Sequence, residues 1–220
     1  KAVQEVSFSI DAGIVYAVIG PNGAGKTTLF NLITGVYKPT SGEIRLDGES
    51  IGGKSPNELA TRGVARTFQN LQICMNMSAI ENVMVGAHLR LDRNLLKAAL
   101  RLPTLTRRDA EMRVEAAELM RFVGLEKYIE ARADAMPYGA LKRLEIARAL
   151  AMKPRLIFLD EPAAGLNPKE TIEVDELIRK VADSGITVVL VEHDMKMVMN
   201  LSDRILVLDY GKKLAEGTGE

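Results

Sequence analysis

The first part of the chain carries the apolar pattern of short strands around one helix. Residues 6–10 alternate between apolar and polar positions, which predicts a strand, and residues 14–19 form a nearly continuous apolar run. A continuous run is typical of a strand that is covered on both faces of a sheet. Leu29 and Leu32 then fall at helical spacing, and residues 43–48 are expected to form another short strand.

The middle of the chain changes to a mostly helical and charged pattern. It extends from about residue 78 to residue 149, and residues 110–123 form its clearest helix. Shorter elements return after it: strands at 155–160 and 186–192, a helix at 169–182 between them, and a hairpin of residues 205–208 with 213–216. This order predicts one α/β domain over residues 1–220, with a core of about 1–70 and 151–220 and a helical subdomain inserted over about 71–150.

The most specific motif lies between the apolar run that ends at Ile19 and the helix that contains Leu29. Its glycine-rich sequence matches the P-loop pattern in the required context, after a buried strand and before a helix. Glycines allow backbone N–H groups to approach phosphate oxygens, and the helix N-terminus adds a partial positive charge. Lys26 is expected to reach the β- and γ-phosphates of ATP, and the Thr27 hydroxyl is expected to ligate Mg²⁺. The predicted nucleotide-binding residues are Gly20, Pro21, Asn22, Gly23, Ala24, Gly25, Lys26, Thr27 and Thr28.

A second apolar strand ends in two carboxylates, Asp160 and Glu161. A P-loop site needs such an acidic element to hold its metal, and we expect Asp160 to hold Mg²⁺ directly or through water at the carboxyl edge of the sheet. One carboxylate is enough for the metal, so the neighbouring Glu161 suits a residue that polarises the attacking water. The alternative is an ordinary surface carboxylate at a strand end.

Two further polar residues are candidates for the same site. His193 ends the apolar run of residues 187–193, a position from which its imidazole would contact the γ-phosphate. A histidine at a strand end is more often structural, and the sequence alone leaves both interpretations open. Gln69 follows a short possible strand just before the helical insertion, where it would contact both the metal and the inserted subdomain.

Composition and charge narrow the class of protein. Lys and Arg together number 29, as do Asp and Glu, and this balance gives no support to a nucleic-acid-binding surface. Cys74 is the only cysteine and cannot form an internal disulfide, which fits a reducing compartment. No apolar run approaches the roughly 18 residues that cross a bilayer, and the first ten residues lack the layout of a signal peptide. We therefore expect a soluble intracellular protein.

The order of these motifs resembles that of the ABC ATPases over nearly the whole chain. The segments that carry the resemblance are GPNGAGKT at 20–27, ARTFQN at 65–70, MPYGA at 136–140, LIFLDEP at 156–162, AGLN at 164–167 and VEHD at 191–194. The resemblance implies a P-loop NTPase core of the ABC ATPase type, with an antiparallel β subdomain and an inserted helical subdomain. It also implies that Glu161, His193 and Gln69 are catalytic, and that Gln69 joins Thr27 and Asp160 at Mg²⁺.

A second anion site is expected at the start of the helix that begins near Tyr138 and Gly139. Leu141 and Leu144 belong to its core-facing stripe, and the N–H groups of its first turn are available to bind phosphate. Two phosphate sites in one chain can serve two ligands, or one ligand shared between two chains. The resemblance implies the second arrangement, with two ATP molecules between two copies and with Tyr138, Gly139 and Ala140 as ATP-binding residues.

The signature segment at 136–140 departs from the family pattern. The family usually has Leu-Ser-Gly-Gly-Gln, whereas the chain has MPYGA, which removes the serine hydroxyl and the glutamine side chain. Asn167 stands where an aspartate is usual. These departures motivate an alternative function, a nucleotide-dependent dimerising module with little hydrolysis. The aromatic residue that stacks on adenine is expected a few residues before Lys1, and Tyr16 in a core strand is a poor substitute.

The finer features of the sequence suggest a transported substrate and a set of partners. PYG in the signature, LEIARALA after it and VEHDMKMVM near the end resemble the ATP-binding subunits of branched-chain amino acid importers. Relatives in the same subgroup serve urea, short amides or other amino acids, so these remain alternatives. A soluble ABC protein that acts on DNA or ribosomes is a further one, although such proteins carry tandem domains or long coiled coils.

The implied partners are transmembrane permease subunits, a second ATPase subunit of the same or a different kind, and, indirectly, a periplasmic or extracellular solute-binding protein. No nucleic-acid partner is expected. The protein would be cytoplasmic and held at the inner face of the cell membrane through the permease. Leu71, Met75, Met77 and Met84 follow Gln69, and they suit either an adaptable docking surface for the permease or ordinary core filling.

Overall fold

The computed structural model describes residues 2–90 and 103–219. The elements of the first part are β1 (Val15–Ile19), α1 (Lys26–Ile33), β2 (Arg45–Leu46), β3 (Glu49–Ser50), α2 (Pro56–Thr61), β4 (Val64–Arg66), α3 (Ala79–Gly86) and the 3₁₀ helix η1 (Ala87–Arg90). Those of the second part are α5 (Pro103–Phe122), η2 (Glu126–Tyr128), η3 (Ala133–Ala135), α6 (Tyr138–Leu150), β5 (Leu156–Asp160), α7 (Pro168–Asp183), β6 (Thr187–Val191), α8 (Met195–Leu201), β7 (Arg204–Asp209) and β8 (Lys212–Gly217).

The chain divides into two compact units. The first unit consists of Lys1–Gln69 together with Pro154–Glu220, and the second consists of Asn70–Lys153. Among the described residues, all the strands belong to the first unit, and the second contains α3, α5 and α6 with the 3₁₀ turns. Each unit is described by itself below.

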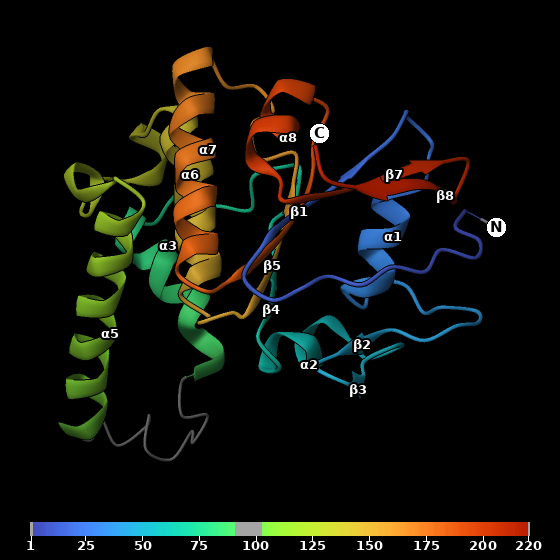
Figure 1. The fold of residues 1–220 in the computed structure, drawn as a ribbon. Coiled ribbons are helices and arrows are strands. Elements are labelled where there is room, and N and C mark those ends of the chain that lie inside the picture. Colours follow the sequence, from blue (N-terminus) through green and yellow to red (C-terminus); the bar gives the residue numbers. More distant parts are fainter. Residues whose placement is uncertain (1, 91–102, 220) are drawn as a thin grey trace. The chain divides into compact units, whose positions relative to one another are not determined.

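A six-stranded sheet forms the centre of the first unit, in the order β4-β5-β6-β1-β7-β8 (Figure 1). All neighbouring pairs are parallel except β7 and β8, which form an antiparallel hairpin. β1 lies between β6 and β7, with Val15 opposite Val188 and Tyr16 opposite Arg204. The strand that leads into the P-loop is therefore central, as its continuous apolar sequence predicted.

Helices cover both faces of this sheet in the first unit (Figure 1). Tyr16, Phe158 and Leu206 belong to one buried cluster with Leu29 and Phe30 of α1, and the Phe30 and Phe158 rings meet edge to face at 5.0 Å. The alternate strand residues point to the opposite face, where α7 contacts β1 and β6. Tyr16 is fully buried and its hydroxyl donates to Glu216 at 2.9 Å, so its ring is not available to a nucleotide base.

Within its described residues the second unit contains α3, α5 and α6, of which α6 is the most deeply buried. The expected stripe of α6 is confirmed, since Leu141, Leu144, Ala147 and Leu150 are all buried, and Lys142 and Glu145 are buried beside it. α3 packs on both α5 and α6. Gly86 at the end of α3 lies so close to the Arg148 carbonyl oxygen of α6 that a Cβ atom there would collide with it.

The predicted strand at residues 6–10 is wrong. This described segment makes none of the sheet's strand pairs, although Val6, Phe8 and Ile10 pack against the buried cluster. Phe8 stacks on Tyr16 with ring centroids 5.8 Å apart. The alternation reflects one-sided burial of an extended segment, because a hydrophobic pattern reports which side chains are covered and not which backbone groups are paired.

The expected strand at residues 43–48 is also wrong in detail. The chain reverses at Asp47 and Gly48, whose φ values of 49° and 81° are those of a type I′ hairpin turn between β2 and β3. Two short helices were not predicted, α2 and α8. Ser55 and Glu58 form a capping box at the start of α2, and Asp194 caps α8.

Candidate functional site

The loop between β1 and α1 has the backbone conformation that only glycine adopts easily. Gly20, Gly23 and Gly25 have φ values of 150°, 83° and 100°. A Cβ atom on Gly20 would in addition collide with the Leu208 carbonyl oxygen. The glycines are therefore required by the geometry of the loop itself.

Lys26 begins α1 and is folded back onto this loop. Its Nζ donates hydrogen bonds to the carbonyl oxygens of Gly20 at 2.7 Å and Pro21 at 3.1 Å, and the residue is buried. Burial disfavours the charged ammonium and lowers the pKa of Lys26, while the charges of Glu161 and Asp160 act in the opposite direction. The cation and both carboxylates thus belong to one electrostatic environment.

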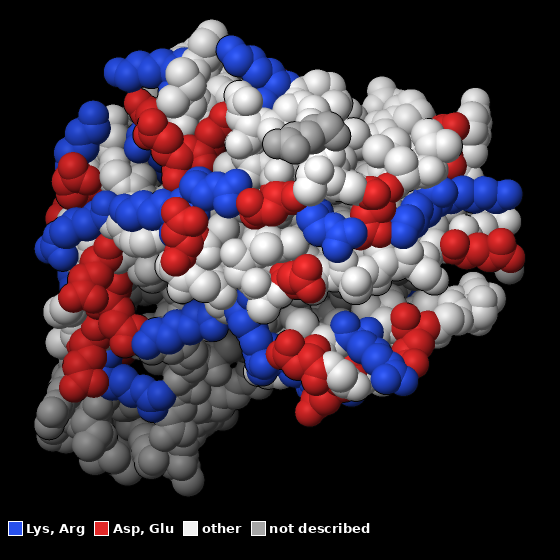
Figure 2. Space-filling model, in the orientation of Figure 1, with Lys and Arg blue, Asp and Glu red and all other residues white. Residues whose placement is uncertain are grey.

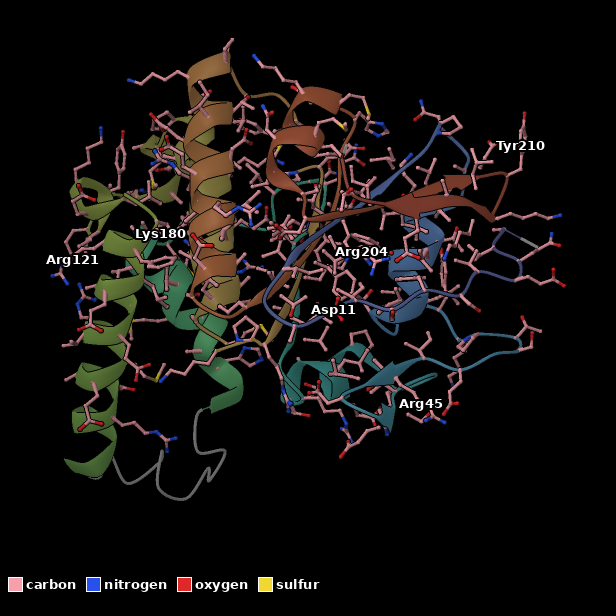
Figure 3. All side chains as sticks on the ribbon, in the orientation of Figure 1. Asp11, Arg45, Arg121, Lys180, Arg204 and Tyr210 are labelled. Carbon is pink, nitrogen blue, oxygen red and sulfur yellow. The ribbon has the colours of Figure 1, made fainter. Side chains whose placement is uncertain are left out.

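The remaining residues of the loop differ in exposure. Asn22 and Thr27 are exposed, Thr28 is half-buried, and Ala24 is buried. The hairpin between β7 and β8 supports the loop, because the Gly211 N–H donates to the Ala24 carbonyl oxygen at 2.9 Å. Tyr210 beside it points outward at the tip of this hairpin (Figure 3) and is 86% exposed.

Glu161 makes hydrogen bonds with two polar residues that were expected at the same site. Gln69 Nε2 donates to Glu161 Oε2 at 2.9 Å, and His193 Nε2 lies 3.0 Å from Glu161 Oε1. Glu161 has a φ of 50°, a conformation that costs a non-glycine residue roughly 1–3 kcal/mol. Its N–H donates to the Val191 carbonyl oxygen at 3.0 Å, which holds this conformation at the end of β5.

Asp160 has a partner that sequence reasoning missed. Arg66, the last residue of β4, donates through Nη2 to Asp160 Oδ2 at 3.1 Å, and the two side chains are only 8% and 9% exposed. No local signal in the sequence indicates this pair. An arginine at a strand end is expected to be exposed, and the two residues are 94 positions apart.

Glu192 was also missed, although it precedes His193. Its Oε1 accepts the Ala163 N–H at 2.9 Å, and its Oε2 accepts the His193 N–H at 3.0 Å. It is 5% exposed. One buried carboxylate therefore ties the loop after Glu161 to the loop that carries His193.

Asn167 has a structural role in the observed conformation. Its side chain accepts the N–H groups of Lys169 and Glu170 at 3.0 Å each and caps α7. The Glu170 carboxylate reaches back to the Asn167 N–H at 3.1 Å, which completes a capping box. Asparagine and aspartate are equally good N-caps, so the departure from the family pattern leaves the helix start intact.

The predicted anion site of the second unit lies at the start of α6. Pro137 is the N-cap residue, and the N–H groups of Ala140 and Leu141 both bond its carbonyl oxygen. Gly139 and Ala140 are buried, whereas Tyr138 is 44% exposed and its ring lies 5.8 Å from the Lys142 ammonium.

The segment after Gln69 is exposed in part and held from inside the second unit. Met75 is 40% exposed, and Leu71, Met77 and Met84 are half-buried. The fully buried Asn82 accepts the Cys74 N–H at 2.8 Å and donates to the Cys74 carbonyl oxygen at 3.0 Å. Cys74 itself is free and exposed.

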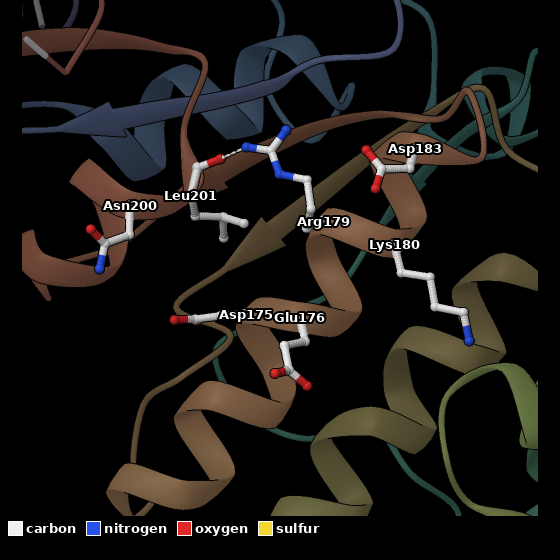
Figure 4. Close-up of a pocket in the computed structure, with 7 residues that line it drawn as sticks. All are labelled: Asp175, Glu176, Arg179, Lys180, Asp183, Asn200 and Leu201. Carbon is white, nitrogen blue, oxygen red and sulfur yellow. Dashed lines mark hydrogen bonds between the residues drawn. The ribbon is translucent and has the colours of Figure 1, made fainter.

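A shallow groove of about 380 Å³ lies between α7 and α8 (Figure 4). Its lining residues are Asp175, Glu176, Arg179, Lys180, Asp183, Asn200 and Leu201. Burial, together with the charges of Asp194, Glu192 and Glu176, raises the pKa of Asp175 to about 6. The groove is lined by both acidic and basic side chains. On the face shown in Figure 2, basic and acidic side chains are likewise interspersed.

The donor set beside the P-loop suits a hard cation. The described residues contain no group of three or more His, Cys, Asp and Glu side chains that could hold a metal. The Asp160 carboxylate and the Thr27 hydroxyl are nevertheless oxygen donors of the kind that Mg²⁺ takes in small number together with substrate phosphates. Within the part of the chain that the structure describes, we find no helix long and apolar enough to cross a membrane.

Comparison with known proteins gives consistent matches. A family model described as "ABC transporter" matches residues 3–164. The high-affinity branched-chain amino acid transport ATP-binding protein BraF of Pseudomonas aeruginosa is 46% identical over 100% of this chain and 86% of its own. The corresponding protein LivG of Escherichia coli (strain K12) is 44% identical over the same shares.

Solved structures of similar fold are ATP-binding cassettes. The ADP conformation of a cassette of an ABC transporter superposes with a TM-score of 0.86 at 32% identity, over 100% of this chain and 85% of that one. A dimeric cassette in a post-hydrolysis state, bound to ADP and Pi, superposes with a TM-score of 0.82 at 27% identity, over 100% of this chain and 91% of that one.

Proposed function

Because the chain belongs to the ABC transporter family, we propose that it is the ATP-binding and ATP-hydrolysing subunit of an importer and powers transport through a separate membrane permease. The observation that carries this proposal is the arrangement in the first unit. Lys26 lies on a glycine loop in the field of two carboxylates, and one of these, Glu161, is held by Gln69 and His193. Residues 1–220 then form one ABC ATPase domain, with the helical insertion at about 71–150.

The loop of residues 20–28 would bind the phosphates of ATP. Its backbone N–H groups and the N-terminus of α1 offer partial positive charge, and Lys26 adds a full charge. The lowered pKa of Lys26 shows that burial already penalises its ammonium, so a phosphate partner would be strongly favoured. Lys26 would exchange its bonds to Gly20 and Pro21 for bonds to the β- and γ-phosphates.

Glu161 would polarise the water that attacks the γ-phosphate. The bonds to Gln69 and His193 hold the two oxygens of this carboxylate at the end of β5, and an ionised carboxylate is an acceptor for the protons of that water. As the water oxygen bonds to phosphorus, Glu161 accepts its proton and the bond to the ADP oxygen breaks. Gln69 and His193 act by orienting Glu161 and by contacting the metal and the γ-phosphate, respectively.

Mg²⁺ would be held by Asp160, Thr27 and Gln69 together with the phosphates. Bound there, it would neutralise charge that develops on the phosphate oxygens. The buried Asp160 offers a fixed carboxylate for this purpose, because Arg66 restrains one of its oxygens.

The start of α6 would complete the ATP site of a second copy of the chain. The dimeric cassette with ADP and Pi supports this arrangement. Tyr138, Gly139 and Ala140 would form this contact. The N–H groups of Tyr138 and Gly139 would face the γ-phosphate of the partner, because the Ala140 N–H already donates to the Pro137 carbonyl oxygen. Backbone groups would do more of this work than in the family pattern, since the signature serine and glutamine are absent from residues 136–140.

The substrate is proposed from the similarity to BraF and LivG, whose names state branched-chain amino acid transport. Urea, short amides or other amino acids are the alternatives from related importers. The partners would be permease subunits, a like or unlike second ATPase subunit and, indirectly, a solute-binding protein. The chain would then be cytoplasmic and peripheral to the membrane.

Replacement of Glu161 by glutamine tests this function. In the complex with its permease, Glu161→Gln should lower the ATPase rate by a factor on the order of 10²–10⁴, the usual contribution of a positioned base, and should retain ATP binding. Lys26→Ala should lose ATP binding as well, because the only side-chain cation of the loop is removed. Glu118→Gln on the exposed side of α5 is the matched control and should behave as the parent. Unchanged turnover in Glu161→Gln would reject the assignment, and a parent that binds ATP without turnover would favour a dimerising module instead.

A further inference from the structure

Arg66 connects several segments of the first unit through one buried guanidinium group. Its Nη2 donates to Asp160 Oδ2 at 3.1 Å. Its Nη1 donates to Asn31 Oδ1 at 2.6 Å and to Thr34 Oγ1 at 2.9 Å, both at the end of α1 or just beyond it. We propose that Arg66 is a positioning residue that orients Asp160 toward the Mg²⁺ of Mg-ATP, an inference that rests on the proposed function.

The hydrogen bonds of Arg66 fix the direction of the Asp160 carboxylate. An arginine usually meets a carboxylate with two parallel bonds, which would occupy both oxygens. Here Nη1 is committed to Asn31 and Thr34, so Asp160 receives a bond on Oδ2 alone. The planar guanidinium thus restrains the carboxylate and leaves Oδ1 for another ligand.

The pair is costly as a purely stabilising contact. Both side chains are more than 90% buried, and a buried ion pair can often be replaced by apolar residues without loss of stability. Arg66 Nε is buried without a hydrogen-bond partner among the described residues, a defect that costs roughly 1–3 kcal/mol. The guanidinium is therefore oriented so that Nη1 and Nη2 make hydrogen bonds, while Nε is left without one among these residues.

Two aromatic rings pack close to the guanidinium and restrain it. Its central carbon lies 4.9 Å from the centroid of the Phe68 ring and 5.9 Å from that of Phe30. Phe68 precedes Gln69, and Phe30 belongs to α1, the helix that begins at Lys26. Through Arg66, the carboxylate of Asp160 is therefore linked to the two segments that carry the other proposed metal and phosphate ligands.

Lysine cannot replace this arrangement. Its ammonium keeps the positive charge but lacks the planar fork that reaches Asp160, Asn31 and Thr34 together. Arg66→Lys therefore keeps the positive charge beside Asp160 but removes the hydrogen-bond geometry that orients the carboxylate. If only the charge mattered, lysine would restore the property that alanine loses.

The test measures the metal preference of ATP binding and does not depend on turnover. ATP affinity is determined by calorimetry for the whole chain, once with Mg²⁺ and once with EDTA. The affinity with Mg²⁺ is divided by the affinity with EDTA, and this ratio is compared between the parent and each variant. Arg66→Ala and Arg66→Lys should each lower this ratio by about 10- to 100-fold, the usual effect of losing an outer-shell partner of a metal ligand. Arg45→Ala, which removes an exposed arginine paired with Glu43 on the β2 hairpin (Figure 3), should leave the ratio unchanged.

A double-mutant cycle identifies the route of the effect. In an Asp160→Asn background, Arg66→Ala should lower the ratio no further, because the carboxylate that it positions is already gone. The proposal is overturned if Arg66→Ala leaves the ratio within threefold of the parent, if lysine restores it, or if it rises, which would make Arg66 a competitor of the metal. An equal loss in the Asp160→Asn background would also overturn it.

The failure of this inference is distinguishable from that of the proposed function. A parent chain that does not bind ATP at all rejects the function, whereas normal ATP binding with an unaffected metal ratio rejects only the role of Arg66. Should Arg66→Ala not fold, as judged by its thermal unfolding, Arg66→Lys retains the buried charge and carries the same comparison.

Discussion

The groove carboxylate Asp175 is expected to destabilise the native protein as the pH rises through acidic values. Its pKa is raised from 3.8 to about 6, first by burial and then by the charges of Asp194, Glu192 and Glu176. Its Oδ1 is buried without a hydrogen-bond partner among the described residues. Arg179 and Lys180 line the same groove, and the raised pKa remains despite them.

The sign of the effect follows from the two protonation equilibria. Below pH 3.8 the carboxyl is protonated in both the folded and the unfolded chain and has no effect on stability. Between 3.8 and about 6 the unfolded chain releases the proton while the native state retains it, so the free energy of unfolding falls across this window. Above it the loss is constant. A shift of this size corresponds to about 3 kcal/mol, which solvent screening of a half-exposed group reduces to about 1 kcal/mol.

Asp175→Asn removes the titrating group and keeps its shape. At pH 7.5 the variant should be more stable by about 1 kcal/mol, which raises Tm by about 2–4 °C for a domain of this size. The difference should shrink as the pH is lowered toward 4.5. Thermal unfolding at several pH values measures it, and Glu176→Gln, on the exposed neighbouring position, should give a smaller change of the same sign. Parallel pH profiles for parent and Asp175→Asn would refute the reasoning.

Two further variants test the second unit. Gly139→Asp should preserve ATP binding by the single chain but abolish ATP-dependent dimerisation and hydrolysis, because it adds bulk and negative charge at the proposed contact with the partner's γ-phosphate. A heterodimer of one Gly139→Asp chain and one Lys26→Ala chain should trap one ATP. Loss of ATP binding by the Gly139→Asp monomer would instead place the residue in its own chain's pocket. Gly86→Ala should destabilise the protein by about 1–3 kcal/mol, since its Cβ collides with the Arg148 carbonyl oxygen. Gly217→Ala, in open space, serves as its control in chemical denaturation, and equal midpoints for the two would contradict the packing argument.

The parts of the molecule that the sequence predicted correctly are those determined by residues close together along the chain. The central strand β1 followed from an unbroken apolar run, and the P-loop followed from glycine positions that the backbone angles require. The α/β core of ABC type is confirmed by the fold and by the cassettes that resemble it. Gln69 and His193 were expected at the same site as Glu161, and the structure brings both within hydrogen-bond distance of its carboxylate, a contact that the sequence did not predict.

What the sequence did not reveal depends on contacts between distant segments. The Arg66–Asp160 pair has no spacing that would indicate it, because each residue alone reads as an ordinary strand end. Glu192 resembles a solvent-exposed neighbour of His193 until its buried bonds to two loops are seen. At residues 6–10 the pattern was correct about burial and wrong about hydrogen bonding, since a side-chain pattern carries no information on a strand partner.

The central place of β1 affects how the protein is made on the ribosome. β1 is synthesised long before its two neighbours in the sheet, β6 and β7, which begin at Thr187 and Arg204. The Ala24 carbonyl oxygen likewise cannot accept its hydrogen bond from the Gly211 N–H until that residue has been synthesised. A nascent chain therefore carries an apolar strand without native sheet partners until β6 and β7 have been synthesised, and such segments are prone to aggregate. The nucleotide-binding loop can acquire its native support only after Gly211 has been synthesised, so products truncated before this residue should lack a functional loop even though they contain its entire motif.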